Sequence, residues 1–513
     1  MTFTAPEIDY AGLSPIIALT AGTVVVLLSG LVGRGRWLPS LLALAALATA
    51  AGLCVWQFGE RGDLVAGALR LDELGLAVSL IVIAAAAFVV PLSLREPAAE
   101  RAGHGDFLAL LLCSTLGMVL LAQAQNLIAL FVALELLSIP LYVLCGSALG
   151  RQQSLESGLK YLIVGSLGSA TLLYGLAFIY GASGSTDFVG IRDGIGGLFD
   201  DPLVLIGIGL AATGLAFKVS LAPFHQWTPD VYEGAPTPVT AFMAVATKAA
   251  AFCVFVRFFD VALGPSVGDW AGPLAVLAVV SIIVGNVGAL GQSSLKRMLG
   301  YSGVAQAGYM LTGIVVATEL GVNALVFYLA AYALMNLPAF AVIAIRERET
   351  DHADDLGALA GLGRDRPELA WPITISMLAL AGLPGTAGFI GKLYLIEAAV
   401  EGDYAWLGVA IAVGTMISLG YYLRVIATVW MRPAEASTAP LPAMAGGSPE
   451  TDAGSPEPEP AATSEARDSR TRCLAILVPT AVAATATVFF GVIPSPLVDW
   501  AANAGEALAS YMA

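Results

Sequence analysis

Long apolar runs, each bounded by charged residues, glycine or proline, recur along the whole 513-residue chain. A run of about 20 apolar residues is long enough to cross the hydrocarbon core of a bilayer as a helix. The pattern therefore predicts an all-α polytopic membrane protein with about fourteen transmembrane helices. The expected spans cover residues 13–33, 37–58, 73–95, 106–122, 126–149, 155–180, 203–221, 236–262, 270–290, 298–318, 321–345, 370–396, 404–431 and 471–494.

Positive charge is distributed unevenly over the loops between these spans. The loops after odd-numbered spans contain about fifteen Lys and Arg residues and the others about four, and an excess of this kind marks cytoplasmic loops. Both termini are therefore expected on the outer side. The acidic N-terminus lacks the features of a cleaved signal, so the first span is expected to be retained. The preference for Arg over Lys and the high Ala content favour a bacterial plasma membrane.

The segment after the thirteenth span differs from the rest of the chain. Residues 432–470 are rich in Pro, Ala, Ser, Glu and Gly, which predicts a disordered acidic cytoplasmic linker. The tail from residue 495 to 513 mixes apolar and polar residues and is expected to form a short amphipathic helix at the outer interface. The rest of the chain is expected to divide into four regions. Residues 1–105 hold helices 1–3, residues 106–262 and 270–431 each hold a five-helix unit, and residues 471–513 hold helix 14 and the tail.

Composition narrows the possible chemistry. The chain is 58% hydrophobic and 12% charged, against about 25% charged in soluble domains, which excludes a soluble globular protein. The five cysteines form no Cys-x-x-Cys pair and only three histidines are present, so neither an iron–sulfur cluster nor a metal site is expected in this chain. The net charge of -15 arises partly from the linker and gives no reason to expect nucleic acid or another specific partner.

Lysine is rare and is concentrated where it is costly. The chain has 24 Lys and Arg residues, and loops use almost only Arg, with Lys296 as the one loop lysine. The other four lysines fall inside predicted spans, where a cation costs roughly 2.5 to 3.5 kcal/mol. A desolvated lysine can lose and regain a proton, whereas arginine stays charged. The pattern predicts a proton relay through Lys160, Lys218, Lys248 and Lys392.

Two further features support an ion path. Glu135 is the only charged residue in the fifth span and could remain ionised beside a lysine from a neighbouring helix. The seventh span is interrupted at Pro223 and the twelfth at residues 383–392, and each break has a lysine beside it. Because these spans are five helices apart they run in opposite directions, which predicts two inverted repeats, spans 4–8 and 9–13.

Simpler interpretations remain open for each residue. Lys160 lies near a span end and could extend to the interface, and Lys392 could satisfy carbonyls freed by the break. Glu135 and Lys248 could belong to structural ion pairs, and His225 could be an ordinary interfacial histidine rather than part of the proton relay. A module in which all these charges only hold helices together is the alternative from another functional class.

The segment from Phe217 to Thr240 resembles the signature of the antiporter-like membrane subunits of respiratory complex I, NADH-quinone oxidoreductase, and of multisubunit cation/proton antiporters. The segments around Glu135 and Lys160, and Lys392 at the second break, are more similar to the N type than to its L and M siblings. The second functional hypothesis is that the chain is a subunit of a multisubunit sodium/proton antiporter.

This resemblance implies a fourteen-helix fold that moves protons while sister subunits, carrying FMN and iron–sulfur clusters, oxidise NADH and reduce quinone. The expected partners are the other membrane subunits, including the sibling antiporter-like chains, and the lipid bilayer; no cofactor is expected in this chain. The resemblance implies that Glu135 and Lys218 form a coupled ion pair and that Lys160 and Lys248 belong to the central charged axis. It implies that Lys392 lies on the exit side and that His225 lies near the cytoplasmic side of the broken seventh helix. One departure is Gln306, where many relatives have a histidine that can take up a proton.

Overall fold

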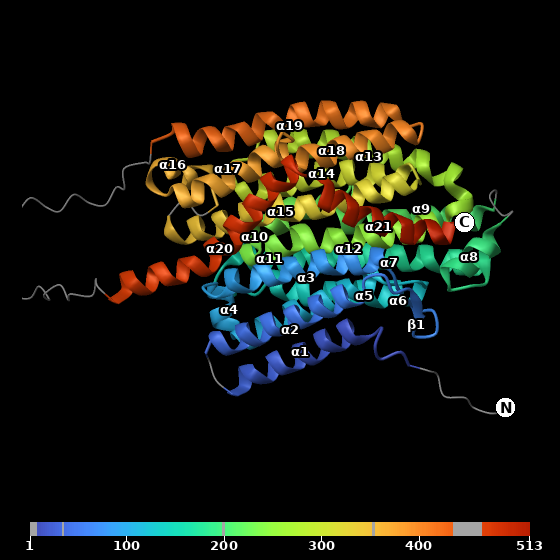
Figure 1. The fold of residues 1–513 in the computed structure, drawn as a ribbon, viewed down its shortest axis with the longest axis horizontal. Helices are drawn as coiled ribbons and strands as arrows, with labels where there is room; N and C mark the ends of the chain where they lie inside the picture. Colours follow the sequence, from blue (N-terminus) through green and yellow to red (C-terminus); the bar gives the residue numbers. More distant parts are fainter. Residues whose placement is uncertain (1–7, 33–34, 197–200, 351–353, 434–463, 513) are drawn as a thin grey trace, which may run out of the picture.

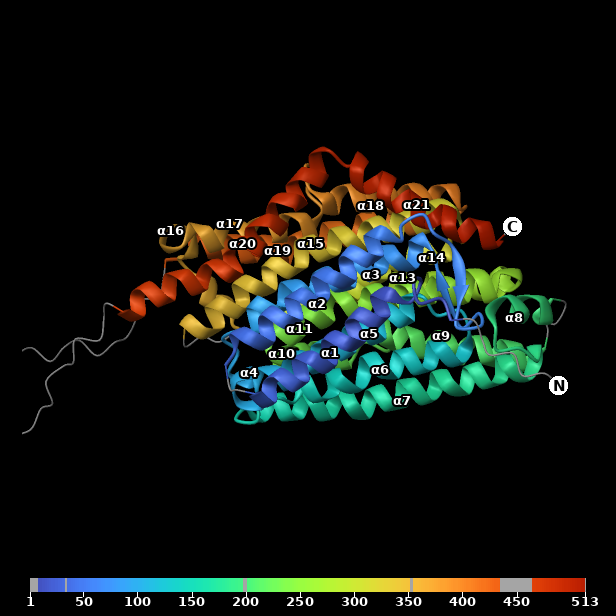
Figure 2. The same ribbon diagram turned by 60° about the horizontal axis from the view of Figure 1, so that its bottom comes forward.

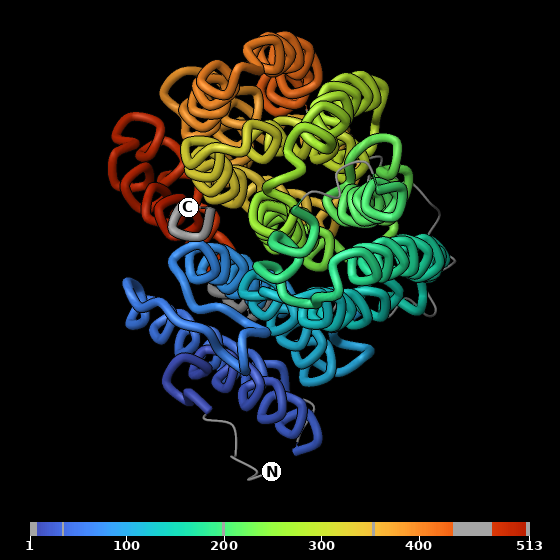
Figure 3. The backbone as a smooth tube through the Cα atoms, turned by 90° about the vertical axis from the view of Figure 1, so that its right-hand side faces the viewer, coloured from blue at the N-terminus to red at the C-terminus, as the bar shows by residue number. Residues whose placement is uncertain are grey.

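The computed structural model describes residues 8–32, 35–196, 201–350, 354–433 and 464–512. These residues form a bundle of long helices that run in roughly the same direction (Figure 1) and are seen end-on in Figure 3. The long helices are α1 (Ser14–Val32), α2 (Trp37–Trp56), α3 (Glu73–Ser93), α5 (His104–Ala122), α6 (Leu127–Cys145), α7 (Gln152–Ser183), α9 (Pro202–Val219), α13 (Val267–Leu290), α14 (Leu295–Val315), α15 (Glu319–Glu349), α19 (Ala405–Met431) and α20 (Ser464–Val492).

Within the described residues, twelve helices are long and apolar enough to cross a membrane, which confirms an all-helical polytopic membrane protein. The two other expected spans, residues 298–318 and 370–396, correspond to α14 and to the interrupted pair α17 (Pro367–Ala381) and α18 (Ala387–Glu401), which are not among the twelve. α14 contains many Gly and polar residues, yet nearly all of it is buried between α13 and α15.

Both expected breaks are present. The helix α9 ends at Val219, and the chain continues without helix to α10 (Trp227–Gly234). The second break separates α17 from α18, and its glycines Gly382 and Gly385 have positive φ angles of 75° and 84°, which favour glycine. Each break leaves backbone groups unbonded by the helix, so polar side chains can reach them.

The eighth span contains two wide turns that the apolar pattern did not predict. It consists of α11 (Thr237–Phe242), the π-helix η1 (Met243–Thr247), α12 (Lys248–Val256) and the π-helix η2 (Arg257–Ala262). All of these residues are buried. Wide turns of this kind occur frequently at functional sites, and here η1 directly precedes a lysine of the predicted relay.

Several short elements connect the long helices and were also not predicted. Residues Gly62–Leu64 and Leu69–Leu71 form an antiparallel hairpin, β1 and β2. The short helical elements are α4 (Pro97–Ala102), α8 (Phe188–Ile195), η3 (Gly264–Ser266), η4 (Leu356–Leu359) and α16 (Leu362–Asp365).

The C-terminal region forms two helices at the edge of the bundle (Figure 2). The first, α20, begins at Ser464, inside the range predicted as linker; residues 434–463 of that linker lie outside the described part of the chain. The tail forms α21 (Ser495–Met512), a helix as predicted. However, it packs against α15 and α3 and buries Leu497, Ala501 and Leu508 there, so its apolar face contacts protein.

A fully buried ion pair joins α3 to the eighth span. Asp72 caps α3 by accepting a hydrogen bond from Gly75 N at 2.8 Å, and its carboxylate also pairs with the Arg257 guanidinium. Arg257 Nε donates to the carbonyl of Ala122 at 2.8 Å. Both side chains are only 1% exposed, so neither charge has water as an alternative partner.

We expect the Arg257→Met variant to lose about 3 kcal/mol of stability, because it leaves the buried Asp72 carboxylate with only the more distant Arg70 guanidinium, at 3.7 Å, among the described cations. The double variant Asp72→Asn with Arg257→Met should recover most of this loss, since asparagine can still cap α3. Thermal unfolding of the purified protein tests both. Equal losses in the single and double variants would contradict a dominant role of the unpaired charge.

Candidate functional site

Lys218 lies in the last turn of α9, directly before the first break, and is buried. Its Nζ donates hydrogen bonds to Ser138 Oγ at 2.7 Å and to Tyr161 OH at 3.3 Å, and lies 5.5 Å from the centre of the Tyr161 ring. The Tyr161 ring in turn stacks on Trp227, the first residue of α10. Lys218 is therefore surrounded by neutral hydroxyl groups and an aromatic face.

Glu135 lies on α6, one turn before Ser138. Its Oε1 atom is buried and has no hydrogen-bond partner among the described residues. No ion pair within 4 Å joins Glu135 to Lys218 in the part of the chain that the structure describes, so the expected pair is not in direct contact. The α6 side chain that contacts Lys218 is Ser138, three residues after Glu135.

Lys248 lies at the start of α12, directly after η1, and is also buried. Its Nζ donates to the backbone carbonyl of Gly303 on α14 and lies 5.9 Å from the centre of the Tyr332 ring. A Cβ atom at position 303 would lie 2.7 Å from Nζ, so a larger residue there would push the flexible end of the Lys248 side chain away from this carbonyl.

Lys392 lies in the second turn of α18 and extends back across the second break. Its Nζ donates to the carbonyl of Leu380 at 2.9 Å and lies 5.1 Å from the centre of the Tyr309 ring. Leu380 is in the last turn of α17, where free carbonyls and the helix dipole attract a cation. The contact is the one expected if Lys392 satisfies carbonyls freed by the break, and it also holds the amine beside polar groups.

A hydrogen-bonded cluster of buried side chains lies between Lys248 and Lys392. Ser302 Oγ and Tyr422 OH are 2.5 Å apart, and Gln306 Nε2 donates to Tyr422 OH at 3.4 Å. Tyr328 OH donates to Gln306 Oε1. Gln306, the departure from the family pattern, is therefore at the centre of this cluster.

The cluster connects the acceptors of the two lysines. Gln306 Nε2 also donates to the Leu380 carbonyl at 3.4 Å, the same oxygen that accepts from Lys392. At the other end, Ser302 immediately precedes Gly303, whose carbonyl accepts from Lys248. With Tyr328 of α15 and Tyr422 of α19, the lysines and the groups between them come from six helices, α12, α14, α15, α17, α18 and α19. Sequence reasoning noticed Gln306 but not its partners.

His225 lies in the first break, between α9 and α10, and is half-buried. Its ring centre is 6.1 Å from that of Tyr301 on α14, and its Nδ1 atom is buried without a hydrogen-bond partner among the described residues. The structure gives it no hydrogen bond or ion pair to any of the four lysines.

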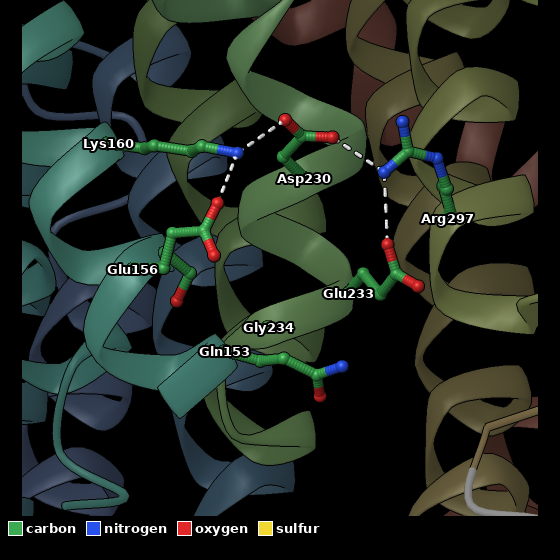
Figure 4. A pocket seen from close by; sticks show the side chains of 8 residues that line it. Gln153, Glu156, Lys160, Asp230, Glu233, Gly234 and Arg297 are labelled. Carbon is green, nitrogen blue, oxygen red and sulfur yellow. Dashed lines mark hydrogen bonds and ion pairs between the residues drawn. The ribbon is translucent and has the colours of Figure 1, made fainter. Parts of the chain in front are cut away.

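Lys160 belongs to a separate group of charges that lines a cavity of about 240 Å³. Its Nζ lies 2.7 Å from Glu156 and 2.9 Å from Asp230, and Arg297 Nη1 lies 2.5 Å from Asp230 and 3.0 Å from Glu233. Figure 4 shows Asp230 of α10 between Lys160 of α7 and Arg297 of α14. The Lys160 side chain is 42% exposed, unlike the other three relay lysines.

This group was only partly predicted. Of its members only Lys160 was given a role from the sequence, and Glu156 and Glu233 are both in ion pairs. The four-residue spacing of Glu156 and Lys160 could have indicated their ion pair, because such residues share one face of a helix. Asp230 and Arg297 come from other helices and were not singled out.

Lys296 corrects the expectation of a loop lysine. It lies in the first turn of α14 and is fully buried. Its Nζ donates to the Ala235 carbonyl at 3.1 Å and lies 3.5 Å from Glu347 Oε1. The apolar pattern misplaced it because α14 begins three residues before the predicted span.

Comparison with known proteins shows the family to which most of this chain is similar. Residues 124–418 match the family described as NADH:quinone oxidoreductase/Mrp antiporter, TM. NADH-quinone oxidoreductase subunit N 1 of Herpetosiphon aurantiacus is 40% identical over 87% of this chain and 92% of that protein, and subunit N of Trichlorobacter lovleyi is 41% identical over 77% and 81%.

Solved structures agree. A chain of respiratory complex I from Thermus thermophilus with bound aureothin has a TM-score of 0.75 at 33% identity, covering 94% of this chain and 98% of that one. A chain of the Mrp complex from Dietzia sp. DQ12-45-1b has a TM-score of 0.81 at 20% identity over 97% of each chain, which shows a shared fold. The chain therefore belongs to the antiporter-like, proton-translocating membrane subunits of NADH-quinone oxidoreductase, as a member of the subunit N group.

Proposed function

We propose that this chain carries protons across the membrane by reversible protonation of Lys218, Lys248 and Lys392, with Lys160, which the family resemblance assigns to the same charged axis, as the fourth lysine of the relay. One observation supports this most strongly: within the described residues, no ion pair includes any of the three buried lysines. Each amine contacts only hydroxyl groups, carbonyls and aromatic faces. A structural ion pair would match a buried amine with a carboxylate, whereas neutral partners allow the amine to exist without its proton.

In this mechanism Glu135 and Lys218 respond to a change arriving from a neighbouring membrane subunit, such as a sibling antiporter-like chain. Moving the carboxylate relative to the amine alters the proton affinity of Lys218, and the proton passes by way of Lys248 toward Lys392. Expelling a charge costs about 2.3 kcal/mol per 100 mV of membrane potential, so the energy must come from NADH oxidation and quinone reduction in sister subunits that carry FMN and iron–sulfur clusters. His225 is proposed to assist proton entry near the first break.

We infer that the bundle has fourteen spans, with residues 106–262 and 270–431 as two inverted repeats. The two helix pairs interrupted beside a lysine, α9–α10 and α17–α18, support this division. The proposed orientation puts the Arg-rich loops in the cytoplasm of a bacterium and both termini outside. In Figure 1 both ends of the described chain lie at the same end of the bundle, as this orientation requires.

Affinity purification through this chain from native membranes, followed by reconstitution in vesicles, tests the assignment. Flavin- and iron–sulfur-containing subunits should copurify, and NADH with quinone should drive proton transport. Sodium/proton exchange by the purified assembly without those subunits would instead support the antiporter alternative. The absence of NADH-driven transport from an active, intact complex would contradict the proposed role.

A further inference from the structure

An apolar groove of about 530 Å³ lies outside the lysine path, between α3, α15, α20 and α21. Representative lining residues are Leu80 and Phe88 of α3, Leu337 of α15, Pro479 of α20 and Trp500 of α21. All fifteen lining residues are apolar, and none belongs to the relay or its hydrogen-bonded cluster. Figure 2 shows α20 and α21 along this edge of the bundle.

A cationic cleft follows the groove toward the end of α3. Between Pro91 of α3, the two residues that follow this helix (Leu94 and Arg95) and Ile476 of α20 lies a shallow cleft of about 10 Å³, which Arg36 also lines. A cleft of this size holds about one water molecule, so a larger group such as a phosphate would lie at its mouth. Arg95 is half-buried and makes no hydrogen bond or ion pair with any described residue. Arg36 has one carboxylate contact, to Glu100 at 3.8 Å, and Glu100 is largely exposed. A contact so long and so exposed neutralises little of the arginine charge.

The dimensions match one leaflet of a bilayer. Leu80 and Pro91, at the far end of the groove and the start of the cleft, are eleven residues apart on α3, which corresponds to about 16 Å at 1.5 Å per residue. Half of a hydrocarbon core of about 30 Å is about 15 Å. The arginines therefore lie at the depth of lipid headgroups when the groove lies at the depth of the acyl chains.

We propose that this site binds one anionic phospholipid, with its phosphate at Arg36 and Arg95 and an acyl chain in the groove between α3 and α20. Basic clefts between membrane helices are known to hold anionic headgroups. A protein helix, about 10 to 12 Å across, is a poorer match to an apolar groove of this volume. The lipid would fill the gap between the C-terminal helices and α3, and so hold α20 and α21 against the bundle.

The test uses the intact complex in nanodiscs that contain a trace of phosphatidylglycerol with a photoreactive diazirine near the end of one acyl chain. Phosphatidylcholine with the same labelled chain is the matched probe. After irradiation, peptides from α3, α15 and α20 should be labelled at least about fivefold more by phosphatidylglycerol, since each arginine near the surface attracts an anionic lipid. Equal labelling by the two probes, or no labelling of these peptides because a neighbouring subunit fills the groove, would overturn the proposal.

Two sets of variants separate the headgroup from the chain. The double variant Arg36→Gln with Arg95→Gln should remove the preference for phosphatidylglycerol, whereas Arg364→Gln, which changes an exposed arginine away from the cleft, should retain it. Ala84→Trp should lower labelling of the groove by both probes at least about twofold by occupying its space. Ala48→Trp, on the exposed face of α2, is its control. A preference that survives the double arginine variant would contradict headgroup binding.

Discussion

The Lys218→Met variant is expected to lower NADH-driven proton pumping by the intact complex at least about tenfold, because it removes the one amine at the end of α9 that can accept and release a proton. Methionine has nearly the same length and is apolar, so the buried site should still be filled. Acidification of inverted membrane vesicles, normalised to the amount of assembled complex, measures the effect.

The Lys218→Arg variant distinguishes a proton relay from a fixed structural charge. Arginine keeps the positive charge and can still donate hydrogen bonds to Ser138 and Tyr161, but it does not release its proton. A relay therefore predicts that pumping stays low in this variant. Recovery to the native rate would show that Lys218 contributes a fixed charge that holds helices together, and the proton path through it would be discarded.

The second large effect is expected from Tyr422→Phe. This change removes the hydroxyl that contacts both Ser302 and Gln306, and so interrupts the polar cluster between Lys248 and Lys392. We expect pumping to fall about tenfold while the bundle remains assembled, since the ring and its packing are retained. Tyr394→Phe on α18 is the control, because this half-buried ring packs against Phe327 and its hydroxyl makes no hydrogen bond with any described residue.

Substitutions of Gln306 test the same polar cluster with one change that should lower pumping and one that should preserve or increase it. Gln306→Leu should reduce pumping to a similar extent as Tyr422→Phe, whereas Gln306→His supplies a group that can itself bind a proton and should preserve or increase pumping. Proton flux in vesicles over a range of pH distinguishes them. Native flux in both Tyr422→Phe and Gln306→Leu would show that protons do not pass through this cluster.

The sequence predicted the helices well because lipid imposes one simple requirement on each span. Residues 73–95, for example, correspond to α3 at Glu73–Ser93, and the break expected at Pro223 lies between α9 and α10. The spacing of apolar residues contains this information locally, and so does proline, which cannot continue a helix.

Contacts between distant segments could not be predicted in this way. Gln306 was visible as an unusual residue, but its partners Tyr328, Leu380 and Tyr422 come from three other helices. A largely apolar span does not indicate which neighbour each face meets. Lys296 was misplaced for a related reason: the groups that bind its buried amine, the Ala235 carbonyl and Glu347, come from segments distant in the sequence.

The wide turn η1 determines the direction in which Lys248 points. A π turn accommodates one more residue than the α-helical turn that it replaces. Each residue of an α-helix accounts for about 100° of rotation, so shortening η1 to regular helix would swing the amine by about that angle, away from the Gly303 carbonyl. One additional backbone residue thus sets the direction of the buried Lys248 side chain.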